Sequence, residues 1–462
     1  MKTICVGLAL WTGVGIGVAT SVGAQASRRE TMRDTTLANG LEIHVVENHA
    51  VPLVTEEIAV RNGAMAQDGG QEGIPHLYEH MLFKGYGGGQ QEFQRELSDL
   101  HGEYNGFTSE ESVGYYVTIA SKKYGDGLSI LARMLRDPDF DDDGLKREKA
   151  VVLNEFDRDM AHPEYQLQRA VEQRLWSTAW GRKNSLGEAG AIVAATPKVL
   201  ATIYHEYYVP NNAALFVSGD VSADAVFNAA RHAFDGWRRG PDPFVAHPVP
   251  PIPSLPSSKA VILTSDVQDV TILLVWQGPS VGETPDLTYA ADVFSTLFDD
   301  PSAPAQLDLV STGLFQELSL SYSTLHHVGP IELTGHTTVA ALPRALAALK
   351  RELIACTRPG AFDDDALAGS RQARRVGRAL SIESGSAAAL RYADWWGIAG
   401  LDYYRAYPDR VAAVTSNDVT AYVETYLTQP YVIGVLGPKA ATPDMTSAVR
   451  AFMVDSTMAA AQ

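Results

Sequence analysis

The stretch "GIPHLYEHMLFKG", residues 73–85, carries two histidines four positions apart, with a glutamate directly before the second. In a helix, His76 and His80 lie one turn apart on the same face, and Glu79 lies beside them. Two imidazoles at this spacing can bind one zinc ion and leave the carboxylate free to polarise a water molecule. The alternative is a pair of core histidines that share a helix face by chance, because two ligands do not complete a zinc site.

A second segment offers carboxylates that could complete the site. In "DDDGLKREKAVVLNEFDRDM", residues 141–160, Glu148 and Glu155 are seven positions apart. Seven positions are close to two helical turns, so both carboxylates are expected on one face, flanked by the apolar Val151 and Val152. A charge on a partly apolar face is stabilised by a partner, and a metal ion is a suitable one. The alternative is that both glutamates are solvated or ion-paired, as on most charged helices.

Local signals predict the two helices that carry these side chains. Pro75 suits the first turn of a helix, and Gly85 is expected to end it. The acidic run from Asp141 to Asp143 offers an N-cap for the second helix.

The chain reads as a doubled unit around a proline-rich linker. The linker, residues 238–258, contains seven prolines and no periodic apolar pattern. It separates a predicted N-terminal domain with the zinc site, residues 27–237, from a predicted C-terminal domain, residues 259–462.

Three landmarks recur in both halves in the same order. They are an apolar run ending on glycine (Gly63 and Gly278), an "FDDD" segment opening a helix (Phe140 and Phe362), and a tyrosine-bearing helix followed by a strand that ends on glycine (Gly219 and Gly437). The first and last landmarks are 156 residues apart in the first half and 159 in the second. The pattern predicts an α+β fold of two homologous domains, each a mostly antiparallel sheet with helices packed on one face.

On these residues the chain resembles the zinc metallopeptidases of the pitrilysin, insulin-degrading enzyme and mitochondrial processing peptidase family, whose inverted motif is H-x-x-E-H. "HLYEHMLFKG" is similar to the family's metal-binding helix, and "EKAVVLNE" is similar to the segment with the third ligand, 75 residues after His80. "GEYNGFTSEESVGYY", residues 102–116, is similar to the strand after the first helix pair. The resemblance implies two domains that form half of a clam-shell chamber.

The resemblance also implies roles for individual residues. His76, His80 and Glu155 would be the ligands of one zinc ion per chain, and Glu79 would be the general base for a zinc-activated water. Glu148 would support the site from behind by orienting a histidine ligand or the neighbouring charge. The implied activity is that of a zinc-dependent endopeptidase acting on peptides or unfolded protein segments.

In this family the substrate pairs as an added strand with a sheet edge near the zinc. The matching edge here is expected around residues 107–116, with Asn105 at its entry. Asn105, Phe107 and Thr108 are therefore candidate substrate contacts. The alternative for Asn105 is a turn residue within "YNGF".

The second half lacks this chemistry. Aligned on the first glycine landmark, the H-x-x-E-H helix falls near "YAADVFSTLFDD", which contains no histidine. Aligned on "FDDD", the two glutamate positions fall near Ser370 and Gly377. We expect the second half to be a scaffold that closes over the substrate.

One departure from the family points to a partner. Self-sufficient members carry an arginine seven residues before a tyrosine, in a stretch that steadies the substrate carbonyl. Here, counting back seven residues from Tyr322 reaches Phe315 and not an arginine. A register set on Gly313 gives Leu309 and Gln316, so neither register contains the pair. A missing electrophile costs orders of magnitude in rate. We therefore expect a zinc-less homologous subunit that supplies the arginine and tyrosine, with a weakly active homodimer as the alternative.

The N-terminal segment and the net charge limit where the protein can act and what it can bind. Residues 1–26 have a basic start, an apolar stretch and an A-x-A ending, which predicts a signal peptide and a periplasmic or secreted protein. The alternative is an uncleaved anchor, since residues 4–23 are almost long enough to span a bilayer. The formal charge of −18 becomes −19 without Lys2, and no basic stripe is present, which argues against nucleic acid as a partner.

A function of another class stays open. Non-catalytic members of the family bind peptides or assemble with a partner, but they lose residues of the inverted motif. This chain keeps both histidines and the glutamate of that motif.

Overall fold

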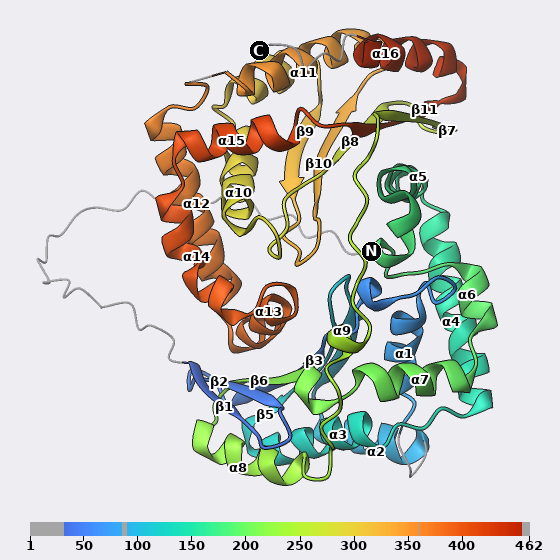
Figure 1. Cartoon of the computed structure of the whole chain (residues 1–462), viewed down its shortest axis with the longest axis vertical. Coiled ribbons are helices and arrows are strands. Elements are labelled where there is room, and N and C mark those ends of the chain that lie inside the picture. The colour runs from blue at the N-terminus through green and yellow to red at the C-terminus, as the bar shows by residue number, and fades with distance from the viewer. Residues whose placement is uncertain (1–31, 86–89, 359, 455–462) are drawn as a thin grey trace, which may run out of the picture. The chain divides into compact units, whose positions relative to one another are not determined.

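The computed structural model describes residues 32–85, 90–358 and 360–454. Two β-sheets are present, each accompanied by helices (Figure 1). The predicted signal peptide, residues 1–26, lies outside the described residues, so its cleavage and the predicted localisation stay predictions. Among the helices that the structure describes, none combines the length and the apolar character needed to cross a membrane.

The first half contains the strands of the first sheet and the helices around it. Its elements are β1 (Met32–Thr36), β2 (Glu42–Glu47), β3 (Leu53–Val60), α1 (Ile74–Leu82), α2 (Gln90–Leu100), β4 (Glu103–Thr108), β5 (Val113–Ala120), α3 (Tyr124–Arg136), α4 (Asp142–Met160), α5 (Pro163–Trp176), α6 (Ala189–Ala194), α7 (Pro197–Tyr207), β6 (Ala213–Gly219) and α8 (Ala223–Ala233).

The second half follows a short helix, α9 (Pro243–Ala246). Its elements are β7 (Lys259–Ser265), β8 (Val270–Gln277), α10 (Pro285–Asp299), β9 (Glu317–Tyr322), β10 (Pro330–Thr337), α11 (Leu342–Cys356), α12 (Asp364–Ser381), α13 (Gly385–Ile398), α14 (Leu401–Ala413), α15 (Ser416–Tyr426), β11 (Tyr431–Pro438) and α16 (Thr442–Val454). Apart from α9, the predicted linker has no helix or strand. The predicted domain boundaries themselves stay a prediction.

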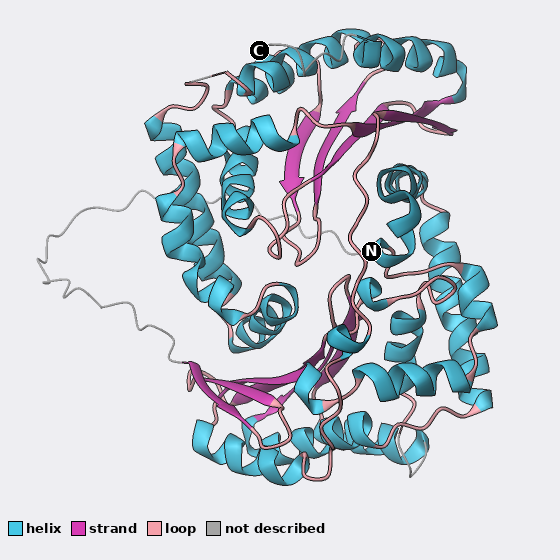
Figure 2. Cartoon of the chain, in the orientation of Figure 1, coloured by secondary structure: helices cyan, strands magenta, loops and turns pink. Residues whose placement is uncertain are grey.

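The two sheets repeat one strand order (Figure 2). The first sheet runs β1-β2-β6-β3-β5-β4 and the second runs β7-β11-β8-β10-β9. In each sheet one pair is parallel, β2 with β6 and β7 with β11, and the remaining pairs are antiparallel. Because β1 alone has no counterpart, the second sheet is the first without its outermost strand. The predicted α+β fold of two related domains is confirmed.

The "FDDD" landmarks open matching helices for the same reason. The Asp141 carboxylate accepts a hydrogen bond from the backbone N–H of Gly144 at 2.7 Å, at the start of α4. The Asp363 carboxylate accepts from the N–H of Ala366 at 2.7 Å, at the start of α12. Each N-cap satisfies a donor that the first helical turn leaves unpaired.

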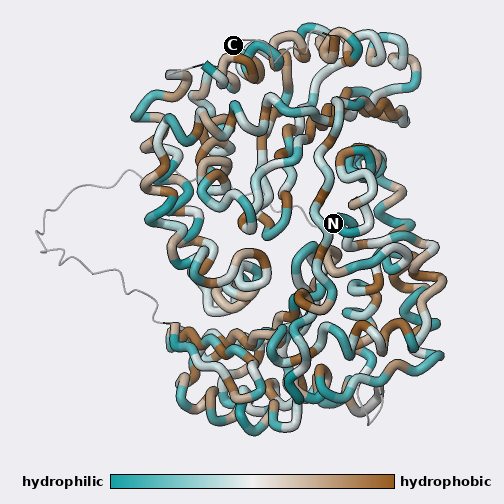
Figure 3. The backbone as a smooth tube through the Cα atoms, viewed as in Figure 1, coloured by the Kyte–Doolittle hydropathy of each residue, from teal (hydrophilic) through white to brown (hydrophobic). Residues whose placement is uncertain are grey.

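Each sheet is buried on both faces. One face packs against helices of the same half, as predicted, and the central strands β6 and β11 have almost no exposed residue. Strands buried on both faces read as nearly continuous hydrophobic runs, and Figure 3 shows hydrophobic residues where β11 and its neighbour β7 lie.

The opposite face of each sheet is covered by a helix from the other half, which the sequence did not predict. Helix α13 packs on the first sheet, where Trp396 and Ala389 join a cluster with Phe216. Helix α5 packs on the second sheet, where a Cβ at Gly434 would lie 2.4 Å from Val171 Cγ2. Only a glycine in β11 lets α5 approach so closely. Helices α5 and α13 directly follow the equivalent helices α4 and α12, so the exchange is reciprocal.

Candidate metal centre and active site

Helix α1 begins at a tight junction that sets the direction of its histidines. Its N-cap, Gly73, has φ of +90°, and a Cβ there would lie 2.8 Å from the backbone oxygen of Leu186. Pro75 occupies the first turn, as predicted. Leu77, Tyr78 and Met81 are fully buried and fix one face of the helix in the core. The remaining face presents the H-x-x-E-H side chains to a cavity.

Helix α4 brings both candidate glutamates to α1. The seven-residue spacing places Glu148 and Glu155 on one face, and both line the same cavity as the histidines. Of the two flanking valines, Val152 is fully buried but Val151 is 41% exposed. The expectation that both valines flank the glutamates on an apolar face is therefore wrong for Val151, because the core reaches only one side of α4.

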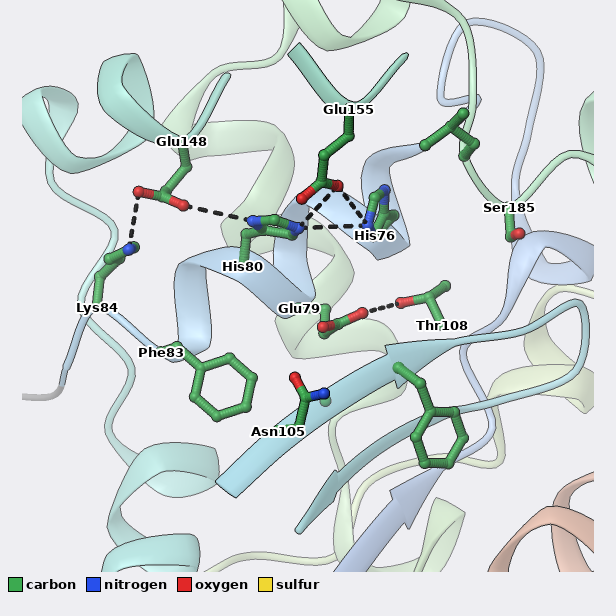
Figure 4. A pocket seen from close by; sticks show the side chains of 13 residues that line it. His76, Glu79, His80, Phe83, Lys84, Asn105, Thr108, Glu148, Glu155 and Ser185 are labelled. Atoms are coloured by element: carbon green, nitrogen blue, oxygen red, sulfur yellow. Dashed lines mark hydrogen bonds and ion pairs between the residues drawn. The ribbon is translucent and has the colours of Figure 1, made fainter. Parts of the chain in front are cut away.

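Three candidate ligand atoms form a nearly regular triangle (Figure 4). His76 Nε2 and His80 Nε2 are 3.3 Å apart, and Glu155 Oε2 lies 3.6 Å from the first and 3.5 Å from the second. Ligand atoms of a tetrahedral site, each about 2.0–2.2 Å from zinc, are themselves about 3.3–3.6 Å apart. The side chains present therefore fit a zinc ion. No other such group of His, Cys, Asp and Glu side chains occurs within the described ranges.

The two histidines differ in how easily they are protonated, and the neutral ring of His76 suits metal binding. Burial, together with the neighbouring His80, lowers the pKa of His76 to about 4, so its ring is neutral at physiological pH. Burial also opposes charge on His80, but the hydrogen bond that its ring donates to Glu148 and the charges of Glu155 and Glu79 outweigh it and raise the pKa of His80. A bound cation would compete for the same lone pair, because zinc binds the neutral imidazole.

Glu148 supports His80 from the side opposite the ligand triangle. Its Oε2 lies 3.4 Å from His80 Nδ1, and its Oε1 pairs with Lys84 Nζ at 2.9 Å. A carboxylate that accepts a hydrogen bond from Nδ1–H keeps the proton on Nδ1. The lone pair of Nε2 is then free to bind a metal ion. His76 differs, because its Nδ1 is buried without a hydrogen-bond partner.

Glu79 lies beside the triangle and faces strand β4 (Figure 4). Thr108 donates a hydrogen bond from Oγ1 to Glu79 Oε2 at 2.8 Å. Burial raises the pKa of Glu79, and the Thr108 hydrogen bond only partly opposes this. A Cβ at Gly106 would lie 2.8 Å from Glu79 Oε1, so a larger residue there would displace the carboxylate from its place beside β4. A raised pKa suits a group that both accepts and returns a proton.

The cavity has a volume of about 430 Å³ and opens beside an edge strand. Asn105, Phe107 and Thr108 all line it, so the structure brings the candidate substrate contacts to the metal centre. The predicted edge, residues 107–116, needs correction. Strand β5 pairs with β3 on one side and β4 on the other, so the free edge belongs to β4 alone. Asn105 lies within that strand, opposite Tyr116, and not in a turn.

Sequence reasoning missed several residues of this site. Lys84 stands four positions after His80, a spacing that could have placed it on the same helical side. Ser185 and Leu186 also line the cavity, but they come from a loop more than a hundred residues later and carry no local signal.

Comparisons with known proteins agree with this fold. A family model described as "Insulinase (Peptidase family M16)" matches residues 43–189, and one described as "Peptidase M16 inactive domain" matches residues 194–373. The chain therefore belongs to peptidase family M16. The first match lies within the half with the candidate metal centre, and the second begins at the end of that half and extends into α12 of the other half.

Individual relatives are distant. A zinc protease of Rickettsia felis is 24% identical over 213 residues, 46% of this chain and 52% of the relative. The mitochondrial-processing peptidase subunit beta of Blastocladiella emersonii is 27% identical over 179 residues, 38% of this chain and 37% of the relative. The chain thus spans about half or less of the length of these relatives.

A solved structure covers more of the chain. The structure of a protease from Helicobacter pylori superposes with a TM-score of 0.78 at 19% identity, covering 88% of this chain and 100% of that chain. At this identity the likeness concerns the fold of both halves together.

Proposed function

We propose that this chain is a zinc-dependent endopeptidase that hydrolyses peptides or unfolded protein segments. The observation that carries the proposal is the triangle of His76 Nε2, His80 Nε2 and Glu155 Oε2 beside the buried carboxylate of Glu79. Three protein ligands are typical of catalytic zinc, whereas structural zinc sites are closed by four.

Zinc, when bound by these ligands, would polarise a peptide carbonyl and make a water molecule more acidic. Glu79 would accept the proton of the attacking water and return it to the leaving amine nitrogen. Thr108 would hold Oε2 of that carboxylate, which leaves Oε1 to handle the proton. Glu148 and Lys84 would keep His80 in the tautomer that presents Nε2.

Strand β4 offers a way to hold the substrate. It is an edge strand whose free side borders the cavity, and its Asn105, Phe107 and Thr108 line that cavity. A peptide that adds as a strand to β4 would bind through its backbone, which tolerates many sequences. Glu79 lies against β4 at Gly106, so the peptide would pass the proton-transferring group.

A partner subunit belongs to the proposal. Among the described residues, which leave out 86–89, the lining of the cavity includes Lys84 but no arginine and no tyrosine. We infer that a zinc-less homologous subunit supplies an arginine and a tyrosine that steady the substrate carbonyl. Several relatives are named as beta subunits of a processing peptidase, which supports a two-chain enzyme. The N-terminal pattern supports action in the periplasm or outside the cell.

The test is hydrolysis of a quenched fluorescent peptide by the full chain, alone and with a candidate sister subunit. We expect weak activity from the lone chain, an increase of about 10² or more with the partner, and loss with a chelator. Full activity of the lone chain would contradict the partner but not the peptidase.

Glu79→Gln separates the peptidase from the alternative, a non-catalytic peptide-binding or assembly subunit. The variant keeps the shape of the side chain and the metal ligands, so zinc content should stay at one per chain. Hydrolysis should fall by about 10² to 10⁴. Hydrolysis that survives this change would contradict the role of Glu79, and hydrolysis absent from the unchanged chain with every partner would favour the alternative.

A further inference from the structure

A second site candidate lies in the other half, where a row of stacked rings ends on an arginine. Tyr289 stacks on Tyr403 with centroids 4.8 Å apart, and Tyr403 stacks on Trp395 at 5.5 Å. Trp395 stacks on Tyr404 at 5.3 Å, and the guanidinium carbon of Arg378 lies 4.4 Å from the centre of the Tyr404 ring. The rings belong to α10, α13 and α14, so the packing of three helices fixes the place of one guanidinium from α12.

Arg378 is held by this aromatic contact and not by an acid. Among the described residues no carboxylate forms an ion pair with it, and its Nε is buried without a hydrogen-bond partner. The position near the C-terminal end of α12 favours a cation. This helix position does not explain why Arg378 Nε is buried without an acceptor, because a buried donor loses its hydration without compensation.

A cavity of about 370 Å³ adjoins this guanidinium. Arg374, Arg378 and Arg391 line it together with Ser381 and aromatic side chains, and no carboxylate from the described part of the chain does. This lining is unexpected in a chain with 55 acidic and 37 basic residues.

The surroundings of the other two arginines leave Arg378 the least neutralised. Arg374 pairs with Asp292 at 3.4 Å, and Arg391 lies 3.7 Å from Asp394. Arg374 and Arg378 are one helical turn apart, where like charges repel each other.

The lining contains a further unsatisfied polar group. Tyr404 is 2% exposed, lines the cavity, and its hydroxyl has no hydrogen-bond partner. Together with Arg378 Nε, this gives two buried donors at one cavity. Both would be satisfied by an acceptor that carries negative charge.

We propose that this cavity binds a small oxyanion, a phosphate or carboxylate group, through the guanidinium of Arg378. Arg374 and Arg391 add positive charge, and the Tyr404 hydroxyl is a further donor to the bound oxygen atoms. A guanidinium suits this role because it donates two parallel hydrogen bonds to a carboxylate or a phosphate. The site is separate from the zinc centre and uses only residues of the second half.

The test is isothermal titration calorimetry of the full chain with inorganic phosphate and, in a second arm at matched ionic strength, with acetate. We expect one saturable site for at least one of the two anions. The anion with the higher affinity indicates whether the natural ligand carries a phosphate or a carboxylate group. Arg378→Gln should weaken this binding by about tenfold or more. The matched control is Arg375→Gln, because Arg375 is an exposed arginine of the same helix that does not line the cavity, and its loss should leave the affinity within about twofold.

A second variant guards against a folding defect in Arg378→Gln. Ser381→Asp keeps all three arginines and the ring stack but adds a competing carboxylate to the cavity, and it should also weaken binding by about fivefold or more. The proposal is overturned if neither anion binds saturably to the unchanged chain. It is also overturned if Arg375→Gln weakens binding as much as Arg378→Gln, or if Ser381→Asp has no effect.

Discussion

The helix pair α1 and α4 and its counterpart α10 and α12 occupy the same place in two related folds, but their facing side chains differ in kind. In the first pair the facing atoms are electron-pair donors, since two imidazole nitrogens and a carboxylate oxygen lie 3.3 to 3.6 Å from one another. Such a grouping is stabilised by a cation shared among the three atoms.

The second pair is closed by direct bonds between donor and acceptor. Ser370 Oγ donates to the backbone oxygen of Val293 at 2.8 Å, and Arg374 Nε donates to that of Asp292 at 2.8 Å. Tyr407 donates its hydroxyl to Asp292 Oδ2 at 2.7 Å. Ser370 stands where sequence alignment put the counterpart of Glu148, so the second half uses that position to join the helices.

The two helix pairs show that the contacts that stabilise the fold are separate from the side chains that could bind a metal. The described residues of the second half show that this topology packs without a group of metal ligands, because hydrogen bonds and apolar contacts join the two helices. The first half keeps an open cavity and polar groups that the chain itself does not satisfy, as with His76 Nδ1. Sites of this kind are typical of function and not of stability.

The largest effect should come from Glu155→Gln, which removes the charged ligand that the second half lacks. An amide is a poor zinc ligand, so we expect zinc content to fall well below one per chain and peptide hydrolysis to fall by about 10² or more. Metal analysis and the peptide assay measure both. Asp157→Asn is the control, because this exposed acid on the same helix lies outside the triangle. Equal losses in both variants would contradict Glu155 as a ligand.

A smaller effect is expected from Glu148→Gln, compared with Ser370→Ala at the equivalent position. Losing the carboxylate behind His80 should weaken zinc binding by about 10 to 100-fold. Ser370→Ala should lower the free energy of unfolding by about 1 kcal/mol, with zinc affinity unchanged. Competition with a chromogenic chelator and chemical denaturation measure the two quantities. A loss of zinc affinity in Ser370→Ala would show that the halves are not independent in this respect.

Thr108→Val should lower kcat by about tenfold while zinc content stays nearly the same, because the hydrogen bond to Glu79 is lost but no metal ligand is touched. Burial already raises the pKa of Glu79, and Thr108 is the group that opposes this shift most. The acid limb of the pH-rate profile should therefore move to higher pH. Thr108→Ser keeps the hydroxyl and should restore both values. An unshifted acid limb in Thr108→Val would contradict this role.

The smallest effect concerns the place where α5 of the first half meets the second sheet. Burial, with the charges of Glu332 and Glu110, raises the pKa of Glu172 to about 8. The folded state therefore holds this proton more tightly than the unfolded chain, whose glutamate pKa is about 4.3. The stability that this proton contributes is complete below that lower pKa and is lost as pH rises towards 8.

Glu172→Gln mimics the protonated side chain and tests this linkage. The variant and the unchanged chain should have similar Tm at pH 4, and the variant should be more stable at pH 8.5. Thermal unfolding at the two pH values measures the difference. A variant that is less stable at pH 8.5 would contradict the raised pKa, and with it the close approach of Glu172 and Glu332 across the two halves.

Much of the fold followed from the sequence because it depends on local patterns. The N-caps at Asp141 and Asp363, the start of α1 at Pro75 and the repeated landmarks are properties of short segments, and the structure confirms them. The wrong expectations concern neighbours distant in the chain. Val151 is exposed because the core meets α4 on one side only, and β4 alone is the edge because β5 pairs on both sides.

By itself, the sequence determined which side chains could meet on one helix face, because helical spacing fixes the relation between His76, Glu79 and His80, and between Glu148 and Glu155. Only the tertiary structure decided that the two helices face each other at ligand distance, that Gly106 and Thr108 approach Glu79, and that α5 and α13 cross to the opposite sheets. It also decided that Arg378 ends a row of rings beside a cavity. These contacts join residues far apart in the chain, and their geometry depends on how whole elements pack, which no local periodicity encodes.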